Sequence, residues 1–533
     1  MDPAKQPVSP SLAEEKEPAT QHISSAQDAE PAPREKAKLS ARSMVRLYVV
    51  MTVGYLVSTM QGYDGSLMGA INAMEPYHRS FGLNGAGSST GVVFIIYNIA
   101  QIAAFPLCGY IADVWGRKPC IFIGCLIVLI GTAVQGAANN LGQFIGGRFV
   151  LGFGAVVAHA AAPAYTVELA HPDYRGLTAG MYNNFWWIGN ILASWTTYGT
   201  NLNLTTSWAW RVPTILQAAL PSIAMVLILI LPESPRWLVA NDRYDEALAI
   251  LAKYHGEGEA EAPIVQLQYK QIIEDHQETD NGRWWDYREL IATRSARYRI
   301  GLVVATAFFG QWSGNNVVSY FMPEMIRNAG ITSSNTQLLI NAINAINAIN
   351  AINAICCWLA SMIGASLLDK AGRRNMMMSG LLGGLISYIL LTAFTAETAT
   401  KPNLSYAVIV FIFTFGVSYA MGMTPSATLY PMECLENRTR GKGSAIKFVF
   451  LNIATMTNTY GVSVGIRKIG WKLYLVYIIW IAIEIVLIYL FFVETKGKTL
   501  EELKQIFESK NPRKASLQKG RVVRDSEVGV KAE

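Results

Sequence analysis

Charged residues are scarce in this sequence. Aspartate, glutamate, lysine and arginine together make up 15% of its 533 residues, whereas hydrophobic residues make up 51%. Soluble domains average about 25% charged residues, and disordered chains combine low hydrophobicity with high charge. The composition therefore argues against a soluble enzyme of ordinary composition and against a chain that is mainly disordered.

Cysteine is also rare, with 6 residues in the chain. Every cysteine lies in or beside an apolar segment, and no two have the Cys-x-x-Cys spacing of a metal site. We therefore expect neither a disulfide framework nor a metal centre, and no motif calls for a cofactor. The remaining class is a polytopic membrane protein.

Twelve segments are long and apolar enough to cross a bilayer as helices, which requires about 20 residues each. No alternating β-barrel pattern is present, so we predict an all-α membrane protein of twelve transmembrane helices in two six-helix halves. The predicted regions are a disordered cytoplasmic tail (1–45), the first half (46–232), a cytoplasmic loop with short helices (233–298), the second half (299–493) and a cytoplasmic C-terminal tail (494–533).

Basic residues concentrate in one set of connections between these segments. Because lysine and arginine are enriched in cytoplasmic loops, we predict that both termini and the central loop are cytoplasmic. This asymmetry explains the formal net charge of +6, and no basic face of a soluble domain suggests nucleic-acid binding. The basic connections contain Arg117 and Lys118, Arg175, Lys370, Arg373 and Arg374, and Arg438, Arg440 and Lys442.

The two halves carry matching charged motifs. Asp-x-x-Gly-Arg follows the second and the eighth segment, and a Glu precedes an Arg by seven residues after the fourth and the tenth. One offset of roughly 260 residues relates these motifs, which indicates two halves of common origin. Such acids and bases can pair across the interface between the halves and form a cytoplasmic gate. The alternative is that they only follow the positive-inside rule, although that rule does not require acids. The gate candidates are Asp113, Arg117, Glu168, Arg175, Asp369, Arg373, Glu433 and Arg440.

Motifs in a fixed order resemble the sugar-porter branch of the major facilitator superfamily over nearly all of residues 45–505. They include Gly62-Tyr63-Asp64, Gly109 to Lys118, Arg148 with Gly152 and Gly154, Pro163 to Glu168, Pro232 to Trp237, Gln311 to Asn316, Asp369 to Arg374, and Glu494 to Gly497. The run from Tyr430 to Gly443 is similar to the fungal lactose-permease and cellodextrin-transporter subgroup. The resemblance implies two pseudo-symmetric halves that alternate access to a central site.

The resemblance also implies a substrate site lined by polar and aromatic side chains. Amides donate and accept hydrogen bonds, as sugar hydroxyls do, although amides can also serve to join helices. The sequence departs from a glucose-type site, because position 310 is Gly and Thr428 stands where hexose carriers often have Trp. The substrate-binding candidates are Asn183, Gln311, Asn315, Asn316, Tyr320 and Asn452.

Asp64 and Arg148 lie inside the first and the fourth apolar segment. Ionisable residues are costly in lipid and indicate function. A carboxyl beside an arginine stays ionised, whereas separation from the arginine in a dry site favours its protonation. The resemblance implies that this pair couples protons to sugar movement, and a permanent structural ion pair is the alternative.

An Ile-Asn-Ala triplet recurs between residues 340 and 355. A three-residue step drifts by about 60° around a helix, so these asparagines cannot all line one cavity. We interpret the run as a triplet expansion that extends the eighth segment into outside solvent, with a functional asparagine ladder as the alternative.

Together these features predict a secondary active transporter that moves a hexose or small disaccharide by alternating access and proton symport. Its partners are then the sugar, protons and the lipid bilayer, and we expect a monomer in the cell membrane. Asn203 and Asn403 begin sequons on the predicted outer side and are candidate glycosylation sites. The alternatives are a carrier that exports a non-sugar molecule such as a secondary metabolite, and a non-transporting sugar receptor. No catalytic constellation supports an enzyme.

Overall fold

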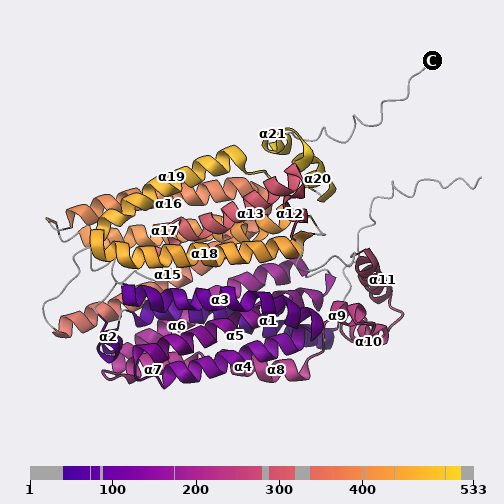
Figure 1. Ribbon diagram of the computed structural model, residues 1–533, viewed down its shortest axis with the longest axis horizontal. Helices are drawn as coiled ribbons and strands as arrows, with labels where there is room; N and C mark the ends of the chain where they lie inside the picture. Colours follow the sequence, from indigo (N-terminus) through magenta and orange to yellow (C-terminus); the bar gives the residue numbers. More distant parts are fainter. Residues whose placement is uncertain are drawn as a thin grey trace, which may run out of the picture. The chain divides into compact units, whose positions relative to one another are not determined.

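The computed structural model describes residues 40–517 except 73, 84–87, 173–174, 279–286, 319–335, 399, 402–403, 437–438 and 499. Long helices dominate this part of the chain, and it contains no β-strand (Figure 1). In the first half the helices are α1 (Ala41–Ile71), α2 (Glu75–Phe81), α3 (Ser88–Val114), α4 (Arg117–Gly136), α5 (Leu141–Glu168), α6 (Arg175–Asn203), α7 (Trp208–Leu216) and α8 (Ala219–Ile230).

Four short helices separate the first half from the second, and two more follow the second half. The connecting helices are α9 (Pro235–Ala240), α10 (Tyr244–His255), α11 (Pro263–Glu278) and α12 (Glu289–Ala292). The second half consists of α13 (Arg294–Trp312), α15 (Thr336–Ala371), α16 (Arg373–Glu397), α17 (Ser405–Cys434), α18 (Arg440–Ile469), the short 3-10 helix η4 (Gly470–Lys472) and α19 (Leu473–Phe491), followed by α20 (Leu500–Glu508) and α21 (Pro512–Leu517).

Nine stretches of the described residues are long and apolar enough to span a membrane, and the last one, Arg440–Phe491, contains both α18 and α19. Helices α6 and α13 complete the set of twelve, with α7 and α8 forming one passage. The predicted all-α fold of twelve helices is therefore confirmed. Helix α15 is 36 residues long, well beyond the length of about 20 residues that a bilayer requires.

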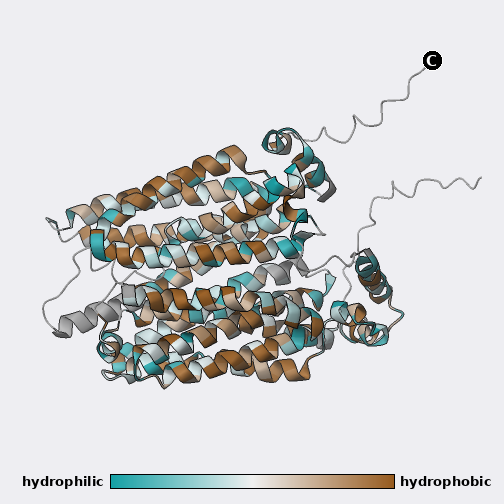
Figure 2. Ribbon diagram, in the orientation of Figure 1, coloured by the Kyte–Doolittle hydropathy of each residue, from teal (hydrophilic) through white to brown (hydrophobic). Residues whose placement is uncertain are grey.

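Large apolar side chains stay exposed along these helices. Ile230, Ile479 and Val226 have exposed fractions of 75%, 63% and 60%. Figure 2 shows apolar residues along the long helices and hydrophilic residues on α10, α11, α20 and α21. An exposed apolar surface of this extent is unfavourable in water and favourable in lipid, so the hydrophobic effect fixes the protein in a bilayer.

Small residues let helices of the same half pack closely. A Cβ atom on Gly131 of α4 would lie 2.4 Å from the backbone nitrogen of Leu151 in α5. In the second half, a Cβ on Gly422 of α17 would lie 2.5 Å from the carbonyl oxygen of Met376 in α16. Close packing of backbones is a main source of helix association in membranes. The two helix pairs thus repeat the same contact in each half.

The two halves meet along two pairs of helices. Helix α3 of the first half packs against α18 of the second, and α6 packs against α15 (Figure 1). Residues on these four helices line the surface along which one half can move past the other.

Candidate functional site

Asp64 of α1 is a fully buried carboxyl with an exposed fraction of 0%. Its Oδ1 accepts a hydrogen bond from Nε2 of Gln217 at 3.0 Å, and its Oδ2 has no hydrogen-bond partner among the described residues. Gln217 follows α7 at the point where the passage formed by α7 and α8 is interrupted. Sequence reasoning missed Gln217, although a polar amide within an apolar segment was an available signal.

Arg148 of α5 lies close enough to Asp64 to act on it electrostatically. Its Nε donates a hydrogen bond to the carbonyl oxygen of Val93 at 3.1 Å, and its guanidinium lies 5.1 Å from the centre of the Tyr97 ring. An amide therefore holds the Asp64 carboxyl, while Arg148 is anchored to α3.

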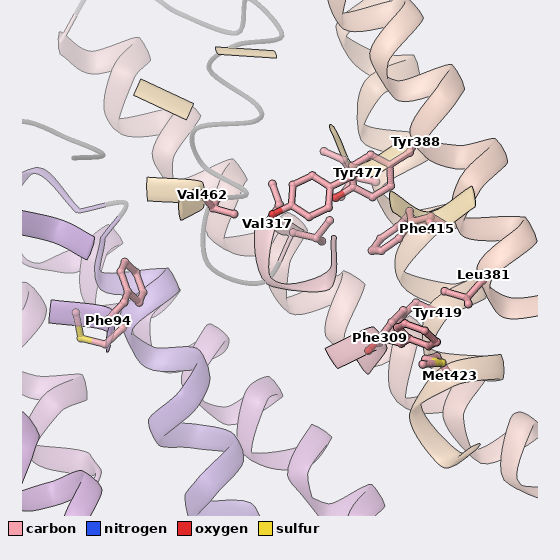
Figure 3. Close-up of a cluster of buried hydrophobic side chains, with 14 of the residues drawn as sticks. Phe94, Phe309, Val317, Leu381, Tyr388, Phe415, Tyr419, Met423, Val462 and Tyr477 are labelled. Carbon is pink, nitrogen blue, oxygen red and sulfur yellow. The ribbon is translucent and has the colours of Figure 1, made fainter. Parts of the chain in front are cut away.

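Helix α13 stops inside the membrane at the predicted sugar-binding motif. Gly314 follows Ser313 with φ of +90°, a conformation that favours glycine. Interrupting a helix leaves carbonyl oxygens without backbone partners, and in lipid these groups need other donors. Tyr419 of α17 donates to the carbonyl oxygen of Gly310. Tyr388 of α16 donates at 2.9 Å to the carbonyl oxygen of Gly314, which also accepts from the backbone nitrogens of Val317 and Val318. Both tyrosines lie close to the end of α13 in Figure 3.

Asn458 of α18 supplies a third donor, because its Nδ2 bonds to the carbonyl oxygen of Gln311 at 2.5 Å. The Tyr477 hydroxyl in turn donates to Oδ1 of Asn458 at 2.5 Å. The interruption is therefore held by side chains from α16, α17 and α18, with α19 behind them. Helix discontinuities of this kind are typical of binding sites in transporters.

The predicted substrate-binding amides fall into separate groups. Gln311, Asn315 and Asn316 lie together at the α13 interruption, where Asn316 is buried and its Nδ2 has no hydrogen-bond partner among the described residues. Asn452 of α18 is also buried, but its Nδ2 donates within its own helix to Phe448 at 3.0 Å. The amide of Asn452 is thus partly occupied by its own helix.

Asn183 of α6 lies on the other half of the molecule. Its Nδ2 donates to Oγ1 of Thr428 on α17 at 3.3 Å, so this candidate contacts the second half directly. The predicted candidate Tyr320 lies outside the described residues, as does Asn403. Asn203 is exposed at the end of α6, and its Nδ2 bonds to the carbonyl oxygen of Gly199 at 2.8 Å.

Glu484 of α19 is a buried acid that sequence reasoning missed. It has an exposed fraction of 0%, and its Oε2 lies 2.7 Å from the hydroxyl of Ser313, beside the α13 interruption. Its Oε1 accepts from the indole nitrogen of Trp480 at 2.5 Å. An acid inside the last apolar segment was the signal that could have identified it.

The charges of the predicted gate pair within each half. In the first half, Arg117 lies 3.6 Å from Asp113 and 3.4 Å from Glu168. In the second half, Nη2 of Arg373 lies 2.8 Å from Oε1 of Glu433. Each described ion pair among the gate candidates thus joins helices of one half, so the expected pairing across the halves is not observed among the described residues.

The other gate candidates are not part of these pairs. The side chains of Arg175 and Asp369 lie outside the described residues, and Arg440 has no ion pair with a described acid. The physical reason for the pairing within halves is proximity: each acid and its arginine lie at the ends of neighbouring helices that pack closely along their length.

Two further glutamates complete this charge network. Glu233 accepts hydrogen bonds from the backbone nitrogens of Arg117 and Lys118, both at 3.1 Å, at the N-terminus of α4. Glu494 accepts from the backbone nitrogen of Arg373 at 2.9 Å, at the N-terminus of α16. Negative charge at a helix N-terminus is stabilised by the helix dipole. Burial raises the pKa of Glu233, and the backbone bonds partly oppose that shift.

A glycine precedes each capped helix. Gly116 has φ of +105° and Gly372 has φ of +91°, and a Cβ on either would lie 2.6 Å from the capping carboxylate. Glu233 and Glu494 lie in two of the motifs that resemble the sugar porters, Pro232 to Trp237 and Glu494 to Gly497. Their role as helix caps requires the chain to return to the start of a distant helix, which the sequence pattern does not reveal.

Aromatic and amide groups, rather than charges, join the halves. Towards the C-terminal end of α3, the rings of Phe105 in α3 and Phe448 in α18 stack with centroids 5.2 Å apart. Between α6 and α15, the hydroxyl of Ser361 donates to Oδ1 of Asn184 at 3.1 Å. At the other end of α3, Gly91 lies against Tyr460 of α18. The halves therefore touch on both sides of the central level.

A family model described as "Sugar (and other) transporter" matches residues 50–507. The chain therefore belongs to this family, the sugar porters of the major facilitator superfamily. It is a multi-pass membrane transporter, since that is what the family and the similar proteins are.

Several curated fungal proteins are similar over most of their length. The MFS-type transporter criB of Aspergillus cristatus is 24% identical over 468 residues, which cover 87% of this chain and 94% of that protein. The MFS-type transporter qa-x of Neurospora crassa and the quinate permease of Neurospora terricola are each 26% identical over 493 residues, covering 87% of this chain and 89% of each relative.

Among solved structures, the inward open conformation of the xylose transporter XylE from E. coli has a TM-score of 0.70 and 22% identity, covering 87% of this chain and 100% of that one. The proton:xylose symporter XylE bound to 6-bromo-6-deoxy-D-glucose has a TM-score of 0.65 and 21% identity, with the same coverage. These likenesses establish the fold.

Proposed function

We propose that the protein is a proton-coupled symporter that moves a sugar across the cell membrane by alternating access. The observation that carries the proposal is Asp64, a fully buried carboxyl held by Gln217 with one oxygen left without a partner among the described residues. A carboxylate in that environment is unfavourable unless a cation or a proton neutralises it. Proton uptake by Asp64 supplies that neutralisation.

The coupling then follows from the position of Arg148. Its positive field favours the ionised form of Asp64 while the two groups are close. A movement that separates them favours the protonated form instead. Asp64 lies on α1, whereas Arg148 of α5 is hydrogen-bonded to Val93 of α3. Movement of α1 relative to α3 and α5 therefore converts a conformational change into proton binding or release.

The sugar site is proposed at the α13 interruption. Gln311, Asn315 and Asn316 present amides there, and amides match hydroxyl groups that both donate and accept. The unsatisfied Nδ2 of Asn316 is a donor available to a ligand hydroxyl. The name of the similar protein XylE, a proton:xylose symporter, supports both the solute class and the coupling ion.

The remaining parts of the proposal concern placement and assembly. We infer that both termini are cytoplasmic, that the protein acts as a monomer in the cell membrane, and that Asn203 is on the outer side and open to glycosylation. The basic residues near α4 and α16 support this orientation, because cytoplasmic loops are rich in lysine and arginine.

A second candidate function is transport of a non-sugar solute. Several relatives are named quinate permease or MFS-type transporter, which favours solutes beyond neutral sugars. Export of a secondary metabolite is the corresponding alternative for direction.

Uptake of labelled sugars in a host without its own sugar transporters tests the proposal. We expect concentrative uptake of at least one hexose, pentose or disaccharide, and collapse of that gradient by a protonophore. Uptake that stops when the sugar concentrations on the two sides are equal would contradict proton coupling. The absence of any sugar movement in either direction would contradict sugar as the substrate.

A further inference from the structure

Lys447 of α18 is a cation within the apolar stretch Arg440–Phe491, which is long enough to span a membrane. It follows the first residue of α18, Arg440, by seven positions, which corresponds to about 10 Å along the helix axis. Its Nζ donates a hydrogen bond to the carbonyl oxygen of Ala427 on α17 at 2.8 Å. The side chain is therefore fixed toward the protein interior rather than extended toward the membrane surface.

The carbonyl oxygen of Ala427 is available because of a proline. In a helix this oxygen would accept from the backbone nitrogen four residues later, and that position is Pro431, which has no N–H group. Lys447 replaces the missing donor. A neutral amide or hydroxyl would satisfy the same carbonyl, so the hydrogen bond explains a donor at position 447 but not a positive charge.

The charge of Lys447 has no acidic partner among the described residues. No described acidic side chain lies within 4.0 Å of its Nζ, whereas Arg117 and Arg373 each pair with acids near the cytoplasmic ends of their helices. An ammonium group has three donors, and Ala427 uses one of them. A lysine inside a membrane helix marks an ion or substrate pathway by default, since the charge is otherwise costly.

The position of Lys447 is at the contact between the halves. The next residue, Phe448, stacks on Phe105 of the first half. Its acceptor Ala427 is followed by Thr428, an exposed residue whose hydroxyl accepts from Asn183 of the first half. Lys447 therefore lies within one residue of two contacts that join the halves, on the cytoplasmic side of the α13 amides.

We propose that Lys447 binds the carboxylate of an anionic, polyhydroxylated substrate, so that the transported class includes sugar acids. This proposal rests on the proposed transport function and narrows its substrate. Asn183, whose amide bonds to Thr428 beside the Ala427 acceptor, contacts the hydroxyl groups, and the two remaining donors of Lys447 contact the carboxylate. A charge-assisted hydrogen bond of this kind distinguishes a carboxylate from a neutral hydroxymethyl group.

The test compares matched pairs of solutes in proteoliposomes containing the full-length protein: D-glucose with D-glucuronate, and D-galactose with D-galacturonate. Each pair keeps the ring and exchanges one hydroxymethyl group for a carboxylate. We expect uptake of at least one uronate by the wild type. In Lys447→Gln, which retains a hydrogen-bond donor for Ala427 and removes the charge, the ratio of uronate to neutral sugar uptake should fall about tenfold or more.

Two control variants separate charge from structure. Lys447→Arg keeps the charge and should retain most of the uronate preference. Lys442→Gln removes a lysine from the same helix, at the cytoplasmic end where it lies 3.9 Å from Glu289, and should leave the ratio unchanged. If the Gln variant does not fold, competition between uronate and neutral sugar on the wild type still decides whether the site accepts a carboxylate.

The outcomes distinguish the two proposals. Wild-type uptake of neutral sugars without any uronate, or an unchanged ratio in Lys447→Gln, overturns the role of Lys447 and leaves the sugar carrier standing. Uptake of uronates alone supports carboxylate binding by Lys447 and shows that neutral sugars are not substrates. Failure of all four solutes to enter overturns both proposals.

Discussion

Replacing Glu484 tests whether the α13 interruption depends on a buried carboxylic acid. The Ser313 hydroxyl has one proton, yet it contacts both the carbonyl oxygen of Phe309 and Oε2 of Glu484. When Ser313 donates to Phe309, Glu484 must be the donor in the other contact and therefore carries a proton. Its second oxygen accepts from Trp480.

The two substitutions of Glu484 have different expected costs. Glu484→Gln preserves both contacts, because its amide nitrogen donates to Ser313 and its oxygen accepts from Trp480. Glu484→Ala removes the contacts to Ser313 and Trp480, together with one methylene and the carboxyl group, from a site with 0% exposure. Each buried polar group left without a hydrogen-bond partner costs about 1–3 kcal/mol. The cost is smaller for Trp480, because its side chain is partly exposed. We therefore expect Glu484→Ala to lower the free energy of unfolding by about 2–4 kcal/mol.

Thermal unfolding of the purified protein in lipid nanodiscs, followed by intrinsic fluorescence, measures this difference. We expect a midpoint close to that of the wild type for Glu484→Gln and a midpoint several degrees lower for Glu484→Ala. Val486→Ala is the matched control, since Val486 is on the same helix with 53% of its surface exposed, and it should change little. Equal destabilisation by Gln and Ala would refute the protonated acid.

Three further predictions follow from the described contacts. Asp64→Asn should abolish uphill accumulation and leave sugar exchange intact, because the amide cannot take up a proton; concentrative uptake at acidic outside pH would contradict this coupling role. Gly116→Ala should destabilise the protein by about 1–3 kcal/mol in the same unfolding assay, because of its φ of +105° and the nearby capping carboxylate, whereas Gly109→Ala, with no heavy atom within 4 Å of the added Cβ, should not. Phe105→Ala removes the ring stack with Phe448 and should increase cysteine-labelling access from the cytoplasmic side, and unchanged access would show that this stack does not close the path.

The helices were predictable because a bilayer imposes one simple requirement. Every span needs about 20 apolar residues in helical conformation, and the hydropathy of the sequence records that requirement directly. Helix α5, Leu141–Glu168, illustrates it, since Arg148 is the only Asp, Glu, Lys or Arg before its last residue. The end of α13 at Trp312 is different: the sequence turns polar from Gln311 to Asn316, but this change does not show whether the helix stops there or continues and presents polar side chains.

The site was less predictable because its contacts join distant parts of the chain. Asp64 and Gln217 are 153 positions apart, and Ser313 and Glu484 are 171 apart. The sequence identified Asp64 as a buried ionisable residue but contained no sign of which amide holds it. Charged motifs were similarly visible, yet their partners depended on which helix ends become neighbours after folding.

The arrangement of the cytoplasmic ion pairs has a consequence for the energetics of transport. Since Arg117 and Arg373 each keep their acids within one half, a rocking motion breaks neither pair. The ion pairs of each half therefore stay intact during the motion. We expect the energy barrier between conformations to depend on the aromatic and amide contacts between the halves. Salt screens charge pairs but not ring stacking. The turnover rate should therefore be nearly independent of ionic strength, even though the cytoplasmic face is rich in charge.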